Sequence, residues 1–188
     1  MVIAICGGIG SGKSGVISVL KKLGAHVAVA DEINRKLLTE SDYLEKLTKL
    51  FPDAINDGVV DTKVIRNAIF NDESKRKELN NLAHPEIFKR IFTLAKEVDN
   101  LFVEVPLLIE SDVKDKFDAI WAVTADIETR IERIMYRDNI SKQSAEKIIK
   151  AQENEDLTLK IADEVISNNG DLKRLENAVI ALYNKYVQ

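Results

Sequence analysis

The chain is poor in cysteine, proline and glycine. The shortage of cysteine excludes intrachain disulfides, and the shortage of proline and glycine leaves few helix breakers. Cys6 is the only cysteine among 188 residues, so no intrachain disulfide can form and a reducing compartment is expected. Because Cys6 lies in an apolar run, we interpret it as a small core residue. Three prolines and eight glycines leave few helix breakers, and five of the glycines lie between Gly7 and Gly15. The rest of the chain is therefore expected to be rich in helix.

Long apolar runs and an excess of basic residues are also missing. No apolar stretch approaches the roughly 20 residues of a membrane span, and the N-terminus lacks the basic segment of a signal peptide. These absences predict a cytoplasmic protein that contacts no membrane. A net charge of −4 argues against a dedicated nucleic-acid-binding protein, although a local site can still bind an anion. The 45% hydrophobic and 31% charged residues are typical of one folded globular domain.

Five short apolar runs are predicted to be strands. The central runs are nearly continuous in apolar side chains, as in parallel strands buried on both faces. Helical patterns separate the runs, and the first helix is expected from Ser14 to Leu23, with Gly24 as its C-terminal cap. This alternation predicts an α/β fold: a doubly wound, five-stranded parallel sheet with helices on both faces. The predicted strands are Val2–Cys6, His26–Ala30, Leu101–Val105, Ala119–Val123 and Glu164–Ile166.

A long insert separates the second and third predicted strands. They lie about seventy residues apart, which is too far for a single crossover helix. Residues 40–94 are therefore predicted to be an inserted helical lobe. Within it, Asp61 and Asp72 are expected to cap helices, and Pro85 to take a first helical position.

A second insert, polar and charged, is predicted at residues 137–159. Ser141 is expected to cap a helix there that reaches Gln152. Two polar inserts on one α/β core indicate parts that close over a ligand. The core itself comprises residues 1–39, 95–136 and 160–188.

The glycines between the first strand and the first helix form a recognisable motif. Residues 7–14, GGIGSGKS, match G-x-x-x-x-G-K-[ST] in the strand-to-helix context that the motif requires. The glycines let backbone N–H groups converge on one anion at a helix N-terminus. A plain glycine turn would not explain the pair that follows, in which Lys13 supplies a cation for phosphates and Ser14 a hydroxyl for Mg²⁺. We therefore predict a nucleoside triphosphate site, with the nucleotide bound by Gly8, Ile9, Gly10, Ser11, Gly12, Lys13, Ser14 and Gly15.

Other classes of triphosphate-binding protein need further motifs. A GTPase is disfavoured because no glycine has an aspartate three positions earlier, and Asn184-Lys185 has no aspartate two positions later. An oligomeric ATPase or motor would need an acidic residue at a strand end to hold metal and polarise water. Glu104 is the candidate for that role.

An acceptor site is expected where the second strand ends. Asp31 directly follows this strand, and it is placed either to take a proton from an acceptor hydroxyl or to cap the next helix. Arg35, one turn later, is placed to hold a substrate phosphate or to pair with Asp31. His84 is placed either to cap a helix or to bind substrate.

Three arginines lie along one face of the helix that approaches the second insert. Arg130, Arg133 and Arg137 are spaced three and four residues apart. Asp126 lies four residues before Arg130, which indicates an ordinary surface ion pair. Arg137 is the better candidate for a mobile phosphate clamp, although a solvated helix face is the alternative.

Several segments, taken in order, resemble the dephospho-coenzyme A kinase family. The phosphate loop alone is not specific, but the ordered set spans nearly the whole chain. Besides residues 7–14, it comprises Ala30-Asp31 with Arg35, Leu82-Ala83-His84-Pro85, Pro106-Leu107-Leu108 with Glu110, Arg137-Asp138, Ala151-Gln152, residues 162–166 and Asn168-Asn169-Gly170.

The resemblance implies transfer of the ATP γ-phosphate to the 3′-hydroxyl of dephospho-coenzyme A, the last step of coenzyme A synthesis. ATP and dephospho-coenzyme A would be the partners, Mg²⁺ the cofactor, and a monomer or weak homo-oligomer the assembly. Residues 40–94 become the coenzyme-side lobe and residues 137–159 the lid. The implied site residues are catalytic Lys13, Asp31 and Arg137; substrate-binding Asp31, Arg35, His84, Pro106 and Leu107; and, near adenine, Asn168 and Gly170.

Two positions depart from the family's pattern. Gly15 stands where the family often has threonine, and it costs helix propensity in the first turn. Val29 stands where the family often has aspartate, so the acceptor site lacks the second carboxylate that this aspartate would supply. Another small-molecule or nucleotide kinase of the same fold is the close alternative, and a non-kinase ATPase is the distant one.

Overall fold

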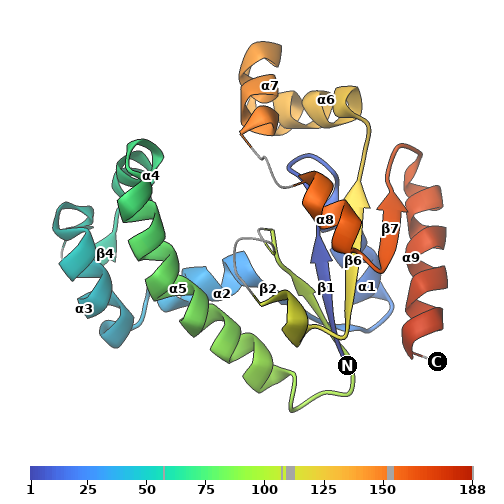
Figure 1. The fold of residues 1–188 in the computed structure, drawn as a ribbon, viewed down its shortest axis with the longest axis horizontal. Helices are drawn as coiled ribbons and strands as arrows, with labels where there is room; N and C mark the ends of the chain where they lie inside the picture. Colours follow the sequence, from blue (N-terminus) through green and yellow to red (C-terminus); the bar gives the residue numbers. More distant parts are fainter. Residues whose placement is uncertain (57, 107, 109–112, 152–154, 188) are drawn as a thin grey trace. The chain divides into compact units, whose positions relative to one another are not determined.

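Five strands form one sheet, in the spatial order β2-β5-β1-β6-β7. They belong to a computed structural model that describes residues 1–56, 58–106, 108, 113–151 and 155–187 (Figure 1). β1 pairs in parallel with β5 and β6, and β6 pairs in parallel with β7. Every predicted strand is present with its ends within one residue, so the expected α/β fold is confirmed. The strands are β1 (Val2–Cys6), β2 (His26–Val29), β5 (Leu101–Glu104), β6 (Ala119–Thr124) and β7 (Glu164–Ser167).

The centre of the sheet is buried, and an aromatic cluster packs α9 (Leu172–Val187) against it. The rings of Phe102 and Trp121, on β5 and β6, are fully buried and their centroids lie 5.3 Å apart. Tyr183 of α9 stacks on Phe102 at 5.8 Å, and Tyr186 meets Trp121 edge-on at 5.4 Å. Each such pair contributes about 0.5–1.5 kcal/mol beyond the area it buries. The apolar runs of the sequence thus become strands because they form the interior of the sheet.

The first helix, α1 (Lys13–Lys22), ends as the sequence predicts. Gly24 has left-handed backbone angles with φ 79°, and its N–H donates to the carbonyl of Lys21 at 3.1 Å. The next residue, Ala25, donates to Leu20 at 3.0 Å. These two bonds satisfy carbonyls that would otherwise be left without partners at the end of the helix.

The chain divides into two compact units. Unit 1 comprises Met1–Ala28 and Ala95–Gln188 and contains most of the sheet, and unit 2 comprises Val29–Leu94. None of the helices in the described ranges is both long and apolar enough to cross a membrane. Besides α1 and α9, unit 1 contains η3 (Lys114–Lys116), α6 (Ile127–Asp138), α7 (Lys142–Lys150) and α8 (Glu155–Ile161).

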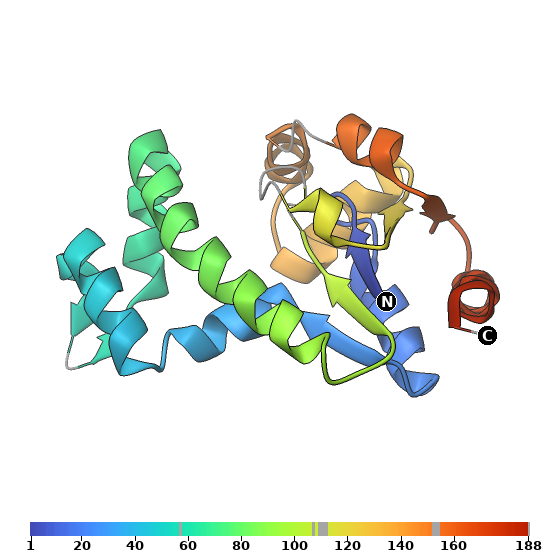
Figure 2. The same ribbon diagram turned by 60° about the horizontal axis from the view of Figure 1, so that its bottom comes forward.

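Unit 2 is mostly helical, and its longest helix packs against three others. In Figures 1 and 2, α5 runs along this unit, and it contacts α2, α3 and α4. The unit also contains a small antiparallel pair of strands that the sequence reading did not predict. The elements are α2 (Ala30–Leu37), α3 (Ser41–Leu50), η1 (Pro52–Ala54), β3 (Ile55–Asn56), β4 (Val59–Val60), α4 (Thr62–Asn71) and α5 (Glu73–Leu94).

The predicted position of Pro85 at the start of a helix is wrong. α5 runs without interruption from Glu73 to Leu94, and Pro85 lies inside it. A proline there has no N–H to donate to the carbonyl four residues earlier, that of Asn81. Asn81 is exposed, so water can satisfy this carbonyl, while the buried residues that follow, such as Ile87 and Phe88, hold the helix in place.

The predicted helix caps are confirmed by their hydrogen bonds. Asp61 accepts from the backbone N–H groups of Lys63 and Val64 at the start of α4. Asp72 accepts from Lys75 in α5 at 3.0 Å, and Ser141 accepts from the N–H of Ser144 in α7 at 3.2 Å. α7 ends at Lys150, and the predicted helix end, Gln152, lies outside the described residues.

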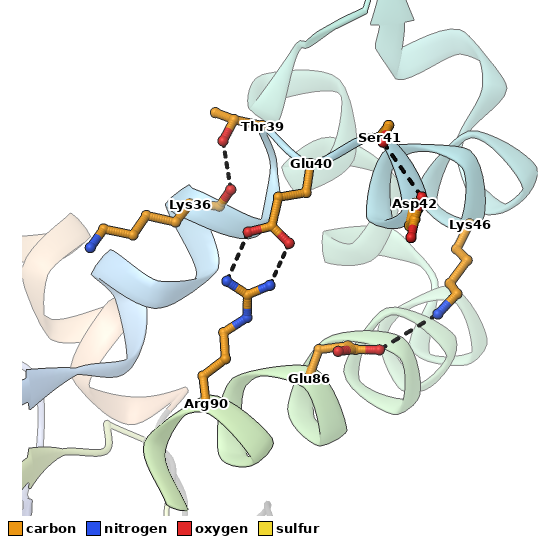
Figure 3. Close-up of polar contacts among 8 residues, drawn as sticks. All are labelled: Lys36, Thr39, Glu40, Ser41, Asp42, Lys46, Glu86 and Arg90. Atoms are coloured by element: carbon orange, nitrogen blue, oxygen red, sulfur yellow. Dashed lines mark hydrogen bonds and ion pairs between the residues drawn. The ribbon is translucent and has the colours of Figure 1, made fainter. Parts of the chain in front are cut away.

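Two ion pairs join α5 to α3 and to the residue before it (Figure 3). The Arg90 guanidinium donates through both terminal nitrogens to the Glu40 carboxylate, with Nη1 2.8 Å from Oε1. Lys46 of α3 lies 3.5 Å from Glu86 of α5. The first pair is bidentate, which adds geometric specificity to the contact.

Candidate active site

The loop after β1 has the backbone conformation that its glycines make possible. The residue before Lys13, Gly12, is left-handed with φ 95°, and Gly10 is left-handed with φ 77°. A Cβ atom on Gly12 would lie 2.1 Å from the side-chain nitrogen of Asn168. One on Gly10 would lie 2.9 Å from the carbonyl oxygen of Arg130. Both the backbone angles and these close neighbours therefore require glycine.

The Lys13 ammonium lies against this loop. Its Nζ donates to the carbonyl oxygens of Gly7 at 2.8 Å and Gly8 at 3.2 Å. The residue is half-buried, so the cation stays at the loop instead of extending into solvent. Phosphate oxygens would bind it more strongly than these neutral carbonyls, because opposite charges strengthen the hydrogen bond. This placement suits capture of the terminal phosphates of a nucleotide.

Cys6, at the end of β1, is a core residue, as predicted. Its side chain is buried, and its Sγ lies 3.6 Å from the carbonyl oxygen of Trp121. Burial raises the pKa of the thiol to about 12, and the nearby charge of Lys13 only partly opposes this. The thiol therefore stays protonated and takes no part in chemistry at neutral pH.

Ser14 is suitably placed for the metal role predicted for it. It is exposed at the start of α1, and its hydroxyl forms no hydrogen bond with any residue that the structure describes. Within the described ranges, no group of three or more acidic, histidine or cysteine residues could hold a metal ion by itself. A Mg²⁺ ion here would thus depend on one hydroxyl, phosphate oxygens and water, a donor set that Mg²⁺ commonly adopts.

Two arginines of α6 contact the loop, and sequence reasoning did not assign them this position. Arg130 Nε donates to the carbonyl oxygen of Ile9 at 2.8 Å. Arg133 Nη1 donates to the carbonyl oxygens of Gly10 and Ser11, each at 3.2 Å. Arg130 is only 4% exposed, so the surface ion pair predicted for it is wrong. The three-residue spacing of the arginines was the signal in the sequence, since it puts both on one helix face.

Asn168, the first residue after β7, joins the same contact. Its side-chain Nδ2 donates to the carbonyl oxygen of Ser11 at 2.8 Å, and its own carbonyl accepts from Arg133 Nη2 at 2.9 Å. Its backbone N–H donates to Thr124 at the end of β6. The side chain is buried and directed at the loop. The roles near adenine expected for Asn168 and the exposed Gly170 stay predictions.

Close packing of α1 against α9 gives Gly15 a structural reason. A Cβ atom on Gly15 would lie 2.9 Å from a methyl carbon of Leu175. Gly15 therefore costs helix propensity but lets α1, which begins at the phosphate loop, approach α9 closely.

Arg137 lies near the C-terminal end of α6, where the predicted lid begins. Its guanidinium donates to the carboxylate of Asp138 through Nε and Nη2, both at 2.7 Å. This hydrogen bonding is the main cause that raises the pKa of Arg137 and lowers the pKa of Asp138. Both residues are exposed, so exchange of the carboxylate for a ligand phosphate would cost little.

The described part of the predicted lid is joined to the phosphate loop by apolar contacts. Ile131 and Ile134 of α6 form a buried cluster with Ala145 and Ile149 of α7. Ile9 of the loop packs against this cluster. A movement of α7 would therefore be transmitted to the loop through side-chain packing.

Three residues predicted for the acceptor site belong to unit 2. Asp31 and Arg35 lie in α2 and His84 lies in α5, and these two helices pack against each other. His84 is half-buried, with its ring edge-on to that of Phe88 at 6.2 Å between centroids. Pro106 follows the end of β5 in unit 1, and Leu107 lies outside the described residues, as do Glu110 and Gln152.

The local setting of Asp31 weakens its alternative role as a helix cap. α2 begins at Ala30, and its N-cap residue is Val29, which makes no side-chain cap. Asp31 is thus in the first turn, and its carboxylate is exposed. Arg35 donates to its backbone carbonyl at 3.4 Å and forms no ion pair with its side chain. The carboxylate is therefore available to a ligand.

Glu104 is the last residue of β5, as the ATPase alternative requires of an acidic residue. The register pairs it with Ile5, one residue before the end of β1. It therefore lies at the edge of the sheet from which the phosphate loop leaves.

Comparisons with known proteins find one family along almost the whole chain. A family model described as dephospho-CoA kinase matches residues 1–174. A dephospho-CoA kinase of Fusobacterium nucleatum is 37% identical over 180 residues, covering 93% of each chain. A dephospho-CoA kinase from Campylobacter jejuni has a similar structure, with a TM-score of 0.73 and 26% identity over 98% of this chain and 96% of its own.

A more distant likeness concerns the fold alone. Shikimate kinase from Acinetobacter baumannii, solved in complex with shikimate, superposes with a TM-score of 0.59 and 15% identity. It covers 100% of this chain and 95% of its own. The sheet and phosphate loop described above are therefore those of a P-loop kinase fold.

Proposed function

Because the chain belongs to the dephospho-CoA kinase family, we propose that it transfers the γ-phosphate of ATP to the 3′-hydroxyl of dephospho-coenzyme A. In this reaction the acceptor oxygen forms a bond to the γ-phosphorus, and the bond between the γ-phosphorus and the β–γ bridging oxygen of ATP breaks, so that this oxygen leaves with ADP. The hydroxyl proton leaves, and the products are coenzyme A and ADP. This is the last step of coenzyme A synthesis.

The geometry of the phosphate loop is the observation that carries this proposal. Lys13 lies at the loop, and the N–H groups of Gly10 and Gly12 donate to no residue in the part of the chain that the structure describes. These donors bind the phosphates and stabilise the charge that shifts onto the β–γ bridging oxygen as it leaves with ADP. Gly8, Ile9, Ser11 and Gly15 complete the ATP site, with Asn168 and Gly170 on the adenine side.

The chain's residues fit a Mg²⁺ ion that arrives with ATP. Ser14 would hold it through its exposed hydroxyl, together with phosphate oxygens and water. Bound in this way, Mg²⁺ would neutralise part of the phosphate charge.

Asp31 is the proposed base. Its exposed carboxylate accepts the proton of the acceptor hydroxyl and orients that hydroxyl toward the phosphate. Arg35, His84, Pro106 and Leu107 would bind the acceptor, and Arg137 would exchange Asp138 for phosphate oxygens when the lid closes.

The division of labour follows the inserts. We assign residues 40–94 to the coenzyme side, residues 137–159 to the lid and the remainder to the nucleotide-binding core. The enzyme would work in the cytoplasm as a monomer or weak homo-oligomer, without nucleic acid or membrane.

One experiment tests the function. ADP production is measured with ATP and dephospho-coenzyme A, with ATP and nucleoside monophosphates, and with ATP alone. We expect rapid turnover only with dephospho-coenzyme A. Turnover with a monophosphate would indicate another kinase, and equal turnover without an acceptor would indicate an ATPase that uses Glu104.

A further inference from the structure

Three consecutive carbonyl groups of the phosphate loop are held by side chains from distant parts of the chain. Those of Ile9, Gly10 and Ser11 accept from the two arginines of α6, as described above. Ser11 also accepts from the side chain of Asn168, which follows β7. The whole carbonyl side of the loop's tip is therefore fixed by the rest of unit 1.

Holding the carbonyls also sets the direction of the N–H groups. In a trans peptide, the carbonyl of one residue and the N–H of the next point to opposite sides. The N–H groups of Gly10, Ser11 and Gly12 consequently face away from the arginines. The Ser11 N–H donates to Gly8 at 3.3 Å, while those of Gly10 and Gly12 donate to no described residue. Those two donors are thus kept oriented toward an incoming anion.

All the side-chain hydrogen bonds that Arg133 forms with the described residues belong to this contact. Its guanidinium donates to three carbonyl oxygens, those of Gly10, Ser11 and Asn168, at 2.9–3.2 Å. It forms no ion pair with any carboxylate in the described ranges. A half-buried arginine that bonds only neutral carbonyls gives up the stronger partner it would find in a carboxylate. The flat five-donor group can bridge three carbonyls at once, which lysine cannot do in the same geometry.

We infer that Arg133, with Asn168, is a positioning residue that holds the phosphate loop in its anion-binding conformation before nucleotide arrives. Arg133 acts on the phosphates through Gly10, Ser11 and Gly12 and not by touching the adenine ring of the nucleotide. The inference rests on the proposed function only in that the loop binds the phosphates of ATP.

The test compares a ligand that has a base with one that has none. Dissociation constants for ADP and for inorganic pyrophosphate are measured by calorimetry on wild-type protein, Arg133→Met and Arg133→Lys. Glu132→Met is the matched control, because Glu132 is the exposed neighbour on the same helix. Thermal midpoints are recorded on the same preparations.

Arg133→Met is expected to weaken ADP and pyrophosphate by the same factor, about 10-fold or more. Arg133→Lys is expected to restore less than half of the lost affinity on a logarithmic scale. The control is expected to bind both ligands as wild type does. If pyrophosphate binds Arg133→Met normally while ADP is weakened, Arg133 contacts the base and the inference is wrong. Full restoration by lysine would also overturn it, since charge alone would then suffice.

A second variant covers the case in which Arg133→Met does not fold. Asn168→Ala removes one bond to Ser11 and is expected to weaken pyrophosphate by a smaller factor, roughly 3-fold or more. Unchanged pyrophosphate binding in Asn168→Ala and Arg133→Lys would contradict the inference. Failure of the proposed function would look different, because wild-type protein would then not transfer phosphate to dephospho-coenzyme A.

Discussion

Replacement of Asp31 by asparagine separates a catalytic base from a structural residue. Asparagine keeps the size of the side chain and its ability to accept hydrogen bonds, but it does not take up a proton at neutral pH. The structure predicts a small cost for the fold. The carboxylate is exposed, does not cap α2, and forms no ion pair with Arg35, whose bond goes to the backbone of Asp31.

The cost in stability can be bounded from the position of Asp31 in α2. The residue lies in the first turn, where a negative charge is favoured by the helix dipole by about 0.3–1 kcal/mol. For a chain of 188 residues, this corresponds to a fall in thermal midpoint of about 1–4 °C. Loss of a general base lowers kcat by ~10²-fold or more, which is about 2.7 kcal/mol in the activation barrier. The effect on catalysis should therefore far exceed the effect on folding.

Glu32→Gln is the matched control. Glu32 lies in the same turn and is also exposed, so this variant loses the same charge near the same helix end. Thermal midpoint, ATP affinity and kcat with dephospho-coenzyme A are measured for both variants. We expect similar midpoints and ATP affinities in the two, with kcat reduced only in Asp31→Asn. A near-normal kcat in Asp31→Asn would refute the assignment and leave positioning and electrostatic stabilisation as the source of catalysis.

Three further predictions concern unit 1. Lys13→Ala is expected to lower kcat by ~10²–10³-fold without unfolding the protein. The control Lys22→Ala, at the exposed end of α1, is expected to leave kcat unchanged. A Lys13 variant with half the wild-type kcat would contradict the loop assignment. Arg137→Ala is expected to lower kcat/KM for ATP by ~10²-fold, and unchanged kinetics would assign Arg137 to a solvated helix face. The Cys6 thiol, with its pKa raised to about 12, is expected to resist alkylation at pH 8 until the protein unfolds. Rapid alkylation of the native protein at pH 8 would refute this. The unfolded thiol ionises near 9.0 and the folded one near 12. The contribution of the thiol to the free energy of unfolding should therefore be complete below pH 9 and fall as the pH rises to 12.

Features that depend on neighbouring residues could be predicted from the amino-acid sequence. Apolar runs identified the strands, since a strand buried on both faces needs apolar side chains throughout. The phosphate loop followed from its own glycines, lysine and serine, which have to be adjacent in the chain to wrap one anion. The caps Asp61, Asp72 and Ser141 followed because a capping side chain reaches only two or three residues ahead. The small strand pair in unit 2 had a local signal that was missed, the Asp57-Gly58 dipeptide between short apolar segments.

Which face of a helix meets which distant segment became clear only from the folded chain. Arg130 bonds Ile9 across 121 residues of sequence, and Asn168 bonds Ser11 across 157. A helical repeat shows that two arginines share a face, but not whether that face meets solvent or a loop. Pro85 shows the same limit, because local preference puts proline at a helix start, while burial of the residues around it continues the helix through it. Motifs and helix caps depend on adjacent residues. Burial depends on the packing of the whole unit, so it cannot be predicted from a single segment of the chain.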